Sequence, residues 1–432
     1  MFKQKSFSIG IFFLFMIGLS GCHDKMYEEH TLNTPTYMSL EELRSSVKVS
    51  PPQSLQKPGK IYFKDNLIFI NEELEGIHII NNENPGSPEF IGFIEIPGNV
   101  DMAIRNNILY ADSYVDLVAF DVSNPEDIHN AGRLNDIFPP IIPPTIDSYG
   151  INYDEIDEEK GVIVGWEVKT ILKEINPDEW QWPYPEQIFW DGAVRNSFAL
   201  SDGASGGGGN TTFGIGGSMA RFTLFSDYLY AVDDRDLKII NIVDPAQMRK
   251  ENSIHLTWRG LETIFQYEEK LFFGTQTGML VYDLANPLSP GFISELNHIQ
   301  SCDPVVVQDD LAYVTLRTGN NCGRGVNRLD IVDLKDISLP VIVKSYDMSN
   351  PHGLGIDGKT LFVCDGTDGL KVFDAEDPLR LKKIAEFPEI DAWDVIPLNG
   401  LLFMIGEDGF FQYDYTGPND IYLLSSIPVD NP

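Results

Sequence analysis

The chain has 432 residues, with 65 acidic and 31 basic side chains and a formal net charge of −34. Apolar residues make up 43% and charged residues 22%, a composition typical of a folded globular protein. The acidic balance argues against a nucleic-acid partner and against electrostatic docking on anionic lipid, because both need clustered cationic side chains. Four cysteines are too few for a fold built on disulfides.

Residues 1–21 predict an export signal of the lipoprotein type. Lys3 and Lys5 precede an apolar stretch at 7–19 that is too short to span a bilayer. The stretch ends in Leu19-Ser20-Gly21-Cys22, which resembles the lipobox of bacterial lipoproteins. The resemblance implies cleavage before Cys22, acylation of its thiol and new amino group, and a stable membrane anchor. The alternative is an ordinary secretory signal with a chance cysteine.

Residues 22–58 are expected to tether this anchor to a folded body. Several prolines and few large apolar residues favour an extended, mobile segment. One short helix is predicted at 39–44, with Ser39 as its N-cap and Glu42 three residues further on.

Residues 59–432 are expected to form a β repeat. A short apolar strand with an aromatic landmark recurs about every 41 residues, followed by a polar turn and a second strand that ends in Asp or Asn. Two successive aromatic landmarks are 120 residues apart, and we interpret this spacing as one period plus an insertion at 136–217. The predicted strand pairs are 67–70 with 76–81, 109–111 with 117–121, 229–232 with 237–241, 271–274 with 279–283, 312–315 with 329–333, 361–364 with 370–374, and 401–405 with 410–414.

A period near 41 with short alternating strands is typical of β-propeller blades. Asx-Pro pairs after the second strand, such as Asn84-Pro85 and Asp377-Pro378, predict tight turns into a further, outer strand. The sequence therefore predicts an all-β fold: a seven-bladed propeller of four-stranded blades, with a large insertion after blade two.

Three of the second strands resemble the LVIVD repeat of bacterial lipoproteins: Leu117-Val118-Ala119-Phe120-Asp121, Leu329-Asp330-Ile331-Val332-Asp333 and Leu370-Lys371-Val372-Phe373-Asp374. The resemblance covers about 59–429. It implies a lipid-anchored propeller of the bacterial cell envelope, with the outer membrane favoured and surface exposure left open. It transfers no catalytic residue and no cofactor. The long insertion and Gln412-Tyr413-Asp414 depart from the pattern.

Propeller geometry selects one position per blade at the mouth of the expected central channel, and every one is ionisable. They are Lys60, Asp101, Arg221, Glu262, Asp303, His352 and Asp394. We interpret them as a candidate binding ring, with a solvated funnel of waters and internal ion pairs as the alternative. Acidic loops on the same face would form a rim that attracts cations or basic partners, with Glu72, Asp112, Asp116 and Asp365 among its members. Residues 365–369 fit a turn better than a calcium loop.

The insertion contains four of the six tryptophans. Its candidate aromatic surface consists of Trp166, Trp180, Trp182, Tyr184 and Trp190. Clustered rings favour recognition of sugars or of a partner's pockets. The alternative is that they pack against blades two and three and anchor the insertion.

Cys302 and Cys322 are expected on one face of blade five. In an oxidising compartment a disulfide between them would stabilise a loop of about 21 residues. Cys364 is predicted to be a buried thiol within a strand of blade six. The sequence contains no recognised zinc-protease, nucleophile-elbow or Cys-x-x-Cys motif, and we expect no metal and no cofactor.

Three functions fit these patterns. The first is a binding module for a glycan, a peptide or an envelope protein. The second is a hydrolase or lyase that acts on an exported polymer at the central mouth, where His352 with Asp303 or Glu262 would be the acid–base pair. The third is a purely structural envelope scaffold. The lack of a catalytic motif favours the binding module.

Overall fold

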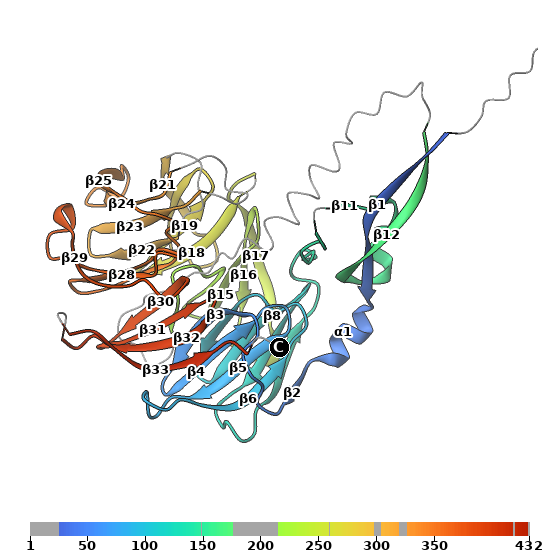
Figure 1. The fold of residues 1–432 in the computed structure, drawn as a ribbon, viewed down its shortest axis with the longest axis horizontal. Helices are drawn as coiled ribbons and strands as arrows, with labels where there is room; N and C mark the ends of the chain where they lie inside the picture. Colours follow the sequence, from blue (N-terminus) through green and yellow to red (C-terminus); the bar gives the residue numbers. More distant parts are fainter. Residues whose placement is uncertain are drawn as a thin grey trace, which may run out of the picture.

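The computed structural model describes residues 26–147, 149–175, 215–258, 260–297, 304–318, 326–417 and 420–430. These residues are arranged in β-sheets, together with one short α-helix, α1 (Leu40–Ser46), and isolated 3-10 turns. The sheets follow one another around the body in chain order, from blue to red in Figure 1. The prediction of an all-β fold is confirmed.

Within the described part of the chain, six sheets are four-stranded antiparallel meanders in sequence order. The first three are β7–β10 (Met102–Arg105, Ile108–Ser113, Asp116–Asp121, His129–Leu134), β14–β17 (Phe222–Phe225, Tyr228–Val232, Asp236–Asn241, Arg249–His255) and β18–β21 (Leu261–Tyr267, Lys270–Thr275, Gly278–Asp283, Gly291–Asn297). The others are β22–β25 (Val305–Gln308, Leu311–Leu316, Arg328–Asp333, Val341–Asp347), β26–β29 (Leu354–Asp357, Thr360–Cys364, Leu370–Asp374, Lys382–Phe387) and β30–β33 (Ala392–Leu398, Leu401–Gly406, Gly409–Asp414, Tyr422–Pro428).

The sheet nearest the N-terminus has the same meander with an added strand at each edge. Its four repeating strands are β3–β6 (Pro58–Lys64, Leu67–Glu72, Gly76–Asn81, Glu89–Glu95). β2 (Lys48–Ser50) pairs with β6, and β13 (Ile215–Gly216) pairs with β3. The predicted strand pairs are therefore the second and third strands of seven meanders.

Local signals in each repeat explain these meanders. The Asx side chain after the third strand closes the turn, as predicted: Asn84 Oδ1 accepts a hydrogen bond from Gly86 N at 3.2 Å, and Asp377 Oδ1 accepts one from Leu379 N at 3.1 Å. In all seven meanders the register then shifts by one residue between the third and fourth strands. Such a bulge bends the outer strand.

The core lies between neighbouring sheets, and all the aromatic landmarks are in it. Phe69, Tyr110, Tyr230, Phe272, Tyr313, Phe362 and Phe403 are each at most 2% exposed. The first strands of successive meanders, from β3 and β7 to β26 and β30, contact one another in chain order, and β3 also contacts β31. The rings of Phe63 and Phe403 stack with centroids 4.7 Å apart, so the sheets at the two ends of the repeat share a core.

Residues 26–50 differ from the extended tether that the sequence predicts. β1 (Met26–Met38) pairs along its whole length with β12 (Val162–Ile175) and briefly with β11 (Gly150–Ile151), and this ribbon projects from the body (Figure 1). The predicted helix is confirmed as α1, where Ser39 Oγ accepts a hydrogen bond from Glu42 N at 3.2 Å. The strand was not predictable locally, because its partner lies more than 120 residues away.

Candidate functional site

Six of the seven predicted mouth residues lie among the described residues, in or just before the first strand of their meander. Asp303 lies outside the described residues. Most are buried rather than lining an open funnel: the exposed fractions of Lys60, Asp101, Glu262, His352 and Asp394 are 6%, 3%, 8%, 6% and 1%, while Arg221 is half-buried.

Asp101 joins three of the first strands. Its Oδ2 accepts hydrogen bonds from Lys60 Nζ at 2.9 Å, from Arg221 N at 2.5 Å and from Phe222 N at 3.1 Å. Its Oδ1 accepts one from Met102 N at 2.7 Å. The carboxylate thus connects β3, β7 and β14, and its acceptor sites are taken up by the protein's own donors.

Asp112 supports this junction from the neighbouring strand β8. Its Oδ1 accepts hydrogen bonds from Asn99 Nδ2 at 2.8 Å, Val100 N at 2.8 Å and Asp101 N at 2.9 Å. Burial raises the pKa of Asp112 to about 6, against the opposing effect of the two backbone donors. The group therefore changes charge close to neutral pH.

The chain runs across the first strands where it returns from the predicted insertion to the repeat. We call residues 215–221 the crossing segment. It begins in β13, beside β3, and its Ser218 donates from both N and Oγ to Asp394 Oδ1, each at 3.0 Å. Ser218 Oγ also accepts a hydrogen bond from Leu354 N at 2.6 Å. One serine thus connects the sheets that begin with β26 and β30.

Glycines allow this close packing. A Cβ on Gly217 would lie 1.7 Å from Asp394 Oδ2, and one on Gly353 would lie 2.1 Å from Asp394 Oδ1. Further along the crossing segment, Ile264 N donates to Ala220 O at 2.8 Å. At Asp394 the predicted mouth is therefore filled by the chain itself.

His352 is enclosed beside β26. Arg317 Nη1 lies 3.1 Å from His352 Nδ1, and Asn350 Nδ2 lies 3.1 Å from His352 Nε2. Burial, followed by the positive charge of Arg317, lowers the pKa of His352 to about 3. A ring with this pKa is neutral at physiological pH and supplies no proton as a general acid.

The carboxylates predicted to form an acidic rim have a repeated structural role. Glu72, Asp112 and Asp365 are 4%, 7% and 0% exposed. Each accepts hydrogen bonds from two consecutive backbone N–H groups ahead of a first strand: those of Gln56 and Lys57, of Val100 and Asp101, and of Ser349 and Asn350. At these three positions the rim is buried, which corrects the expectation of solvated charge.

Residues 365–369 form a turn, as predicted, in which Asp368 N donates to Asp365 O at 3.1 Å. Asp365 also pairs with Lys371. Among the residues that the structure describes, no group of three His, Cys, Asp or Glu side chains is arranged to hold a metal ion.

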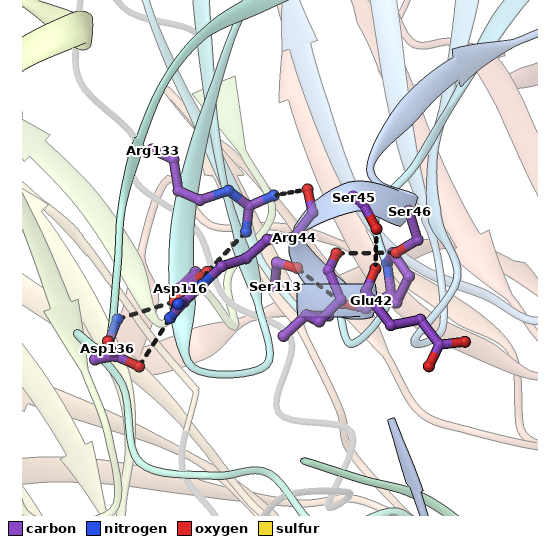
Figure 2. Close-up of polar contacts among 10 residues, drawn as sticks. Glu42, Arg44, Ser45, Ser46, Ser113, Asp116, Arg133 and Asp136 are labelled. Carbon is purple, nitrogen blue, oxygen red and sulfur yellow. Dashed lines mark hydrogen bonds and ion pairs between the residues drawn. The ribbon is translucent and has the colours of Figure 1, made fainter. Parts of the chain in front are cut away.

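Asp116, another predicted rim residue, docks α1 on the body. Figure 2 shows its fully buried carboxylate between Arg44 of α1 and Arg133 of β10. Arg44 Nε donates to Asp116 Oδ2 at 2.9 Å, Arg133 Nη1 donates to the same oxygen at 2.8 Å, and Asp136 N donates to Oδ1 at 2.9 Å. Burial raises the pKa of Asp116, but these three hydrogen bonds outweigh burial and leave it below its ordinary value.

An apolar contact accompanies this ion pair. Leu43 of α1 is fully buried and packs with Tyr114 and Val115 of the β8–β9 turn and with Val162 of β12. The helix is thus fixed between the body and the ribbon.

Trp166 is the one residue of the predicted aromatic surface that lies among the described residues. It is 7% exposed, packs with Ile142 and Ile163, and donates from Nε1 to Pro143 O at 2.8 Å. This ring is therefore buried and not part of an open recognition surface, and the side chains it packs with belong to the insertion and to β1, not to blades two and three. The rest of the set lies outside the described residues: Trp180, Trp182, Tyr184 and Trp190.

The cysteine predictions are tested only in part. Cys364 is a fully buried thiol in β27, as expected. Cys22, Cys302 and Cys322 lie outside the described residues, so acylation and the disulfide stay predictions. No helix in the described ranges has the length and apolar character needed to cross a membrane.

Trp258 was not among the predicted site residues. Its side chain is 83% exposed, more than any other large apolar side chain in the described part of the chain. It lies in the loop between β17 and β18, which leads into the first strand that carries Glu262. The sequence feature that could have identified it is a tryptophan in a short loop between two strands, where the repeat has no core residue.

No family model matches the chain, and no curated protein matches it. Among solved structures, the computationally designed Ika8 protein is similar at 7% identity and a TM-score of 0.50, over 87% of this chain and 88% of that chain. A protein from Lactobacillus plantarum aligns at 11% identity and a TM-score of 0.48, over 84% and 98%. PorZ, a surface component of the type-IX secretion system of Porphyromonas gingivalis, aligns at 11% identity and a TM-score of 0.45, over 89% and 40%. The likeness to the designed protein concerns the fold alone.

Proposed function

We propose that this chain is a lipoprotein of the bacterial cell envelope, anchored through Cys22, whose body is a binding module. The anchor is supported by the basic start, the short apolar stretch and Leu19-Ser20-Gly21-Cys22. The resemblance of three strands to the LVIVD repeat favours the outer membrane as its location.

We infer that the body is a closed seven-bladed propeller. Seven meanders, the contacts between successive first strands and the contact of β3 with β31 support closure. The shared core of Phe63 and Phe403 supports the same arrangement. Closure packs the first and last sheets against each other, so that neither end of the repeat exposes an apolar face.

The packing of the crossing segment against Asp394 is the observation that favours binding over catalysis. The carboxylates of Asp101 and Asp394 accept hydrogen bonds from the protein's own chain, and His352 is neutral and enclosed. A substrate at the mouth would have to displace these contacts. The outer surfaces of the body are therefore the favoured place for a partner, and the hydrolase or lyase alternative gains no specific support.

The ribbon and α1 suit a body presented at a set distance from a membrane. Met26, four residues after Cys22, pairs with Ile175 at the end of the ribbon. At about 3.3 Å per residue, β1 spans about 40 Å. Because Arg44 and Leu43 fix α1 to the body, the chain from Met26 onward is connected to the body by ordered structure.

Acylation is tested by expressing the full chain in a Gram-negative host and fractionating its membranes. We expect the wild-type chain in the membrane fraction, with an acylated Cys22 at its N-terminus by mass spectrometry. Cys22→Ser should leave that fraction, whereas Cys364→Ala, which alters a buried thiol, should stay. An unmodified Cys22 in the mature chain would refute the anchor.

Binding and catalysis are separated with the unlipidated mature chain, made as Cys22→Ser. We expect it to retain exported polysaccharides or peptides without releasing products. Product release that His352→Ala abolishes would instead support the hydrolase or lyase.

A further inference from the structure

The loop between β17 and β18 presents Trp258 to solvent. The N–H groups of Leu256 and Thr257 both donate to Arg235 O, at 3.0 and 3.3 Å. At the other end of the loop, Gly260 N donates to Asp234 Oδ1 at 2.9 Å, and Gly260 has a positive φ of 77°. Residues on both sides of Trp258 are thus attached to the β15–β16 turn.

One polar side chain contacts the indole and is paired with a second one. The ring of His255 contacts Trp258 edge-on, with centroids 5.1 Å apart and an interplanar angle of 68°. His255 Nδ1 lies 2.9 Å from Asp236 Oδ1. The side chains of His255, Asp236 and Arg235 are 47%, 38% and 49% exposed, so each can still reach a ligand.

This composition fits a sugar better than a protein surface. The core of a protein interface is an apolar patch, whereas Trp258 contacts the polar ring of His255, and Leu256 of the same loop is half-buried. A sugar ring needs one aromatic face for its C–H groups and nearby donors and acceptors for its hydroxyls. The net charge of −34 disfavours polyanionic ligands.

We propose that Trp258 is the stacking platform of a binding site for neutral saccharides. A pyranose ring lies on the indole, and Asp236, His255 and Arg235 bond its hydroxyls. This inference rests on the proposed role as a binding module and names its ligand class and its site.

The test uses the unlipidated mature chain in affinity electrophoresis against gels that contain dextran, yeast mannan, barley β-glucan, xyloglucan or soluble starch. We expect at least one polysaccharide to retard the wild-type chain. Trp258→Ala should weaken binding at least tenfold, and Trp258→Phe, which keeps an aromatic face, should keep most of it. Phe292→Ala is the matched control, because Phe292 is 59% exposed but lies on the outer strand β21.

Three results would overturn the inference: no retardation by any of the five polysaccharides, unchanged binding by Trp258→Ala, or an equal loss in Phe292→Ala. Capture of a protein through Trp258 would also overturn it and make the loop a protein contact. Other results would overturn the proposed function without overturning this inference. Saccharide binding through Trp258 with release of products would leave the platform intact and remove the purely binding role, whereas an unmodified Cys22 would remove only the anchor.

Discussion

The hydroxyl of Ser218 donates to Asp394 Oδ1 at 3.0 Å, across 176 positions of sequence. This bond connects the crossing segment to the last meander of the repeat. Because Leu354 N donates to the same hydroxyl, the contact also includes the sheet that begins with β26. The segment in which the chain returns from the insertion to the repeat is therefore part of the centre of the body.

Gly217→Ala should disturb this contact. The added Cβ would lie 1.7 Å from Asp394 Oδ2, so either the carboxylate or the crossing segment must move. Overpacking of this kind costs about 1–3 kcal/mol of unfolding free energy, measured by guanidinium denaturation. Gly92→Ala is the matched control, because a Cβ there meets nothing within 4 Å and should change stability by less than about 0.5 kcal/mol. Equal stabilities for the two variants would show that the packing at Asp394 is loose.

Asp116→Ala should release α1 from the body. The change leaves Arg44 and Arg133 facing each other without their shared carboxylate. Arg44 is 28% exposed, so we expect a loss of about 2–3 kcal/mol, less than a fully buried pair would cost. Faster proteolysis within residues 39–50 should accompany the loss.

The control for Asp116→Ala is Arg380→Ala, which removes an ion pair with Asp377 in which the arginine is 84% exposed. Its effect should stay within about 0.5 kcal/mol. If Asp116→Ala were equally mild, the interpretation of Asp116 as the docking point of α1 would be wrong.

The sequence predicted the repeat well because its signals are local. Strand alternation, an aromatic landmark such as Phe69 and an Asx turn such as that of Asn84 all lie within one meander. Contacts between distant segments were not predictable. Neither the pairing of Met26 with Ile175 nor the hydrogen bond of Ser218 with Asp394 produces a repeating pattern in the sequence.

Buried carboxylates were the other source of error. The sequence placed Asp365 in an acidic rim that would attract cations, and such a role needs an exposed carboxylate. The structure shows that the N–H groups of Ser349 and Asn350 need an acceptor, which Asp365 supplies. Which backbone N–H groups need an acceptor depends on where the neighbouring strands begin, and a single sequence does not show this.

Asp112 should make stability depend on pH. Its folded-state pKa is raised to about 6 by burial, so its contribution is fully present below about pH 4 and is lost as the pH rises through 6. Asp112→Asn keeps an acceptor for Val100 N and Asp101 N but does not ionise. Between pH 4.5 and 7.5 the stability of the variant relative to wild type should increase by about 2 kcal/mol, measured by denaturation at both values. A difference in unfolding free energy between the variant and wild type that does not change with pH would contradict the raised pKa of Asp112.

His352 should remain neutral throughout the range in which an acid–base residue would work. Burial and the charge of Arg317 lower its pKa to about 3, so its ring carbon resonances should not move between pH 8 and 4.5 in spectra of histidine-labelled protein. Arg317→Gln removes the second cause and leaves burial, so the midpoint should rise but stay below the ordinary value. Because the folded-state pKa is lowered, the neutral ring contributes stability above about pH 6.5 that is lost as the pH falls. A wild-type midpoint above pH 5 would contradict this environment and would reopen the possibility of catalysis at His352.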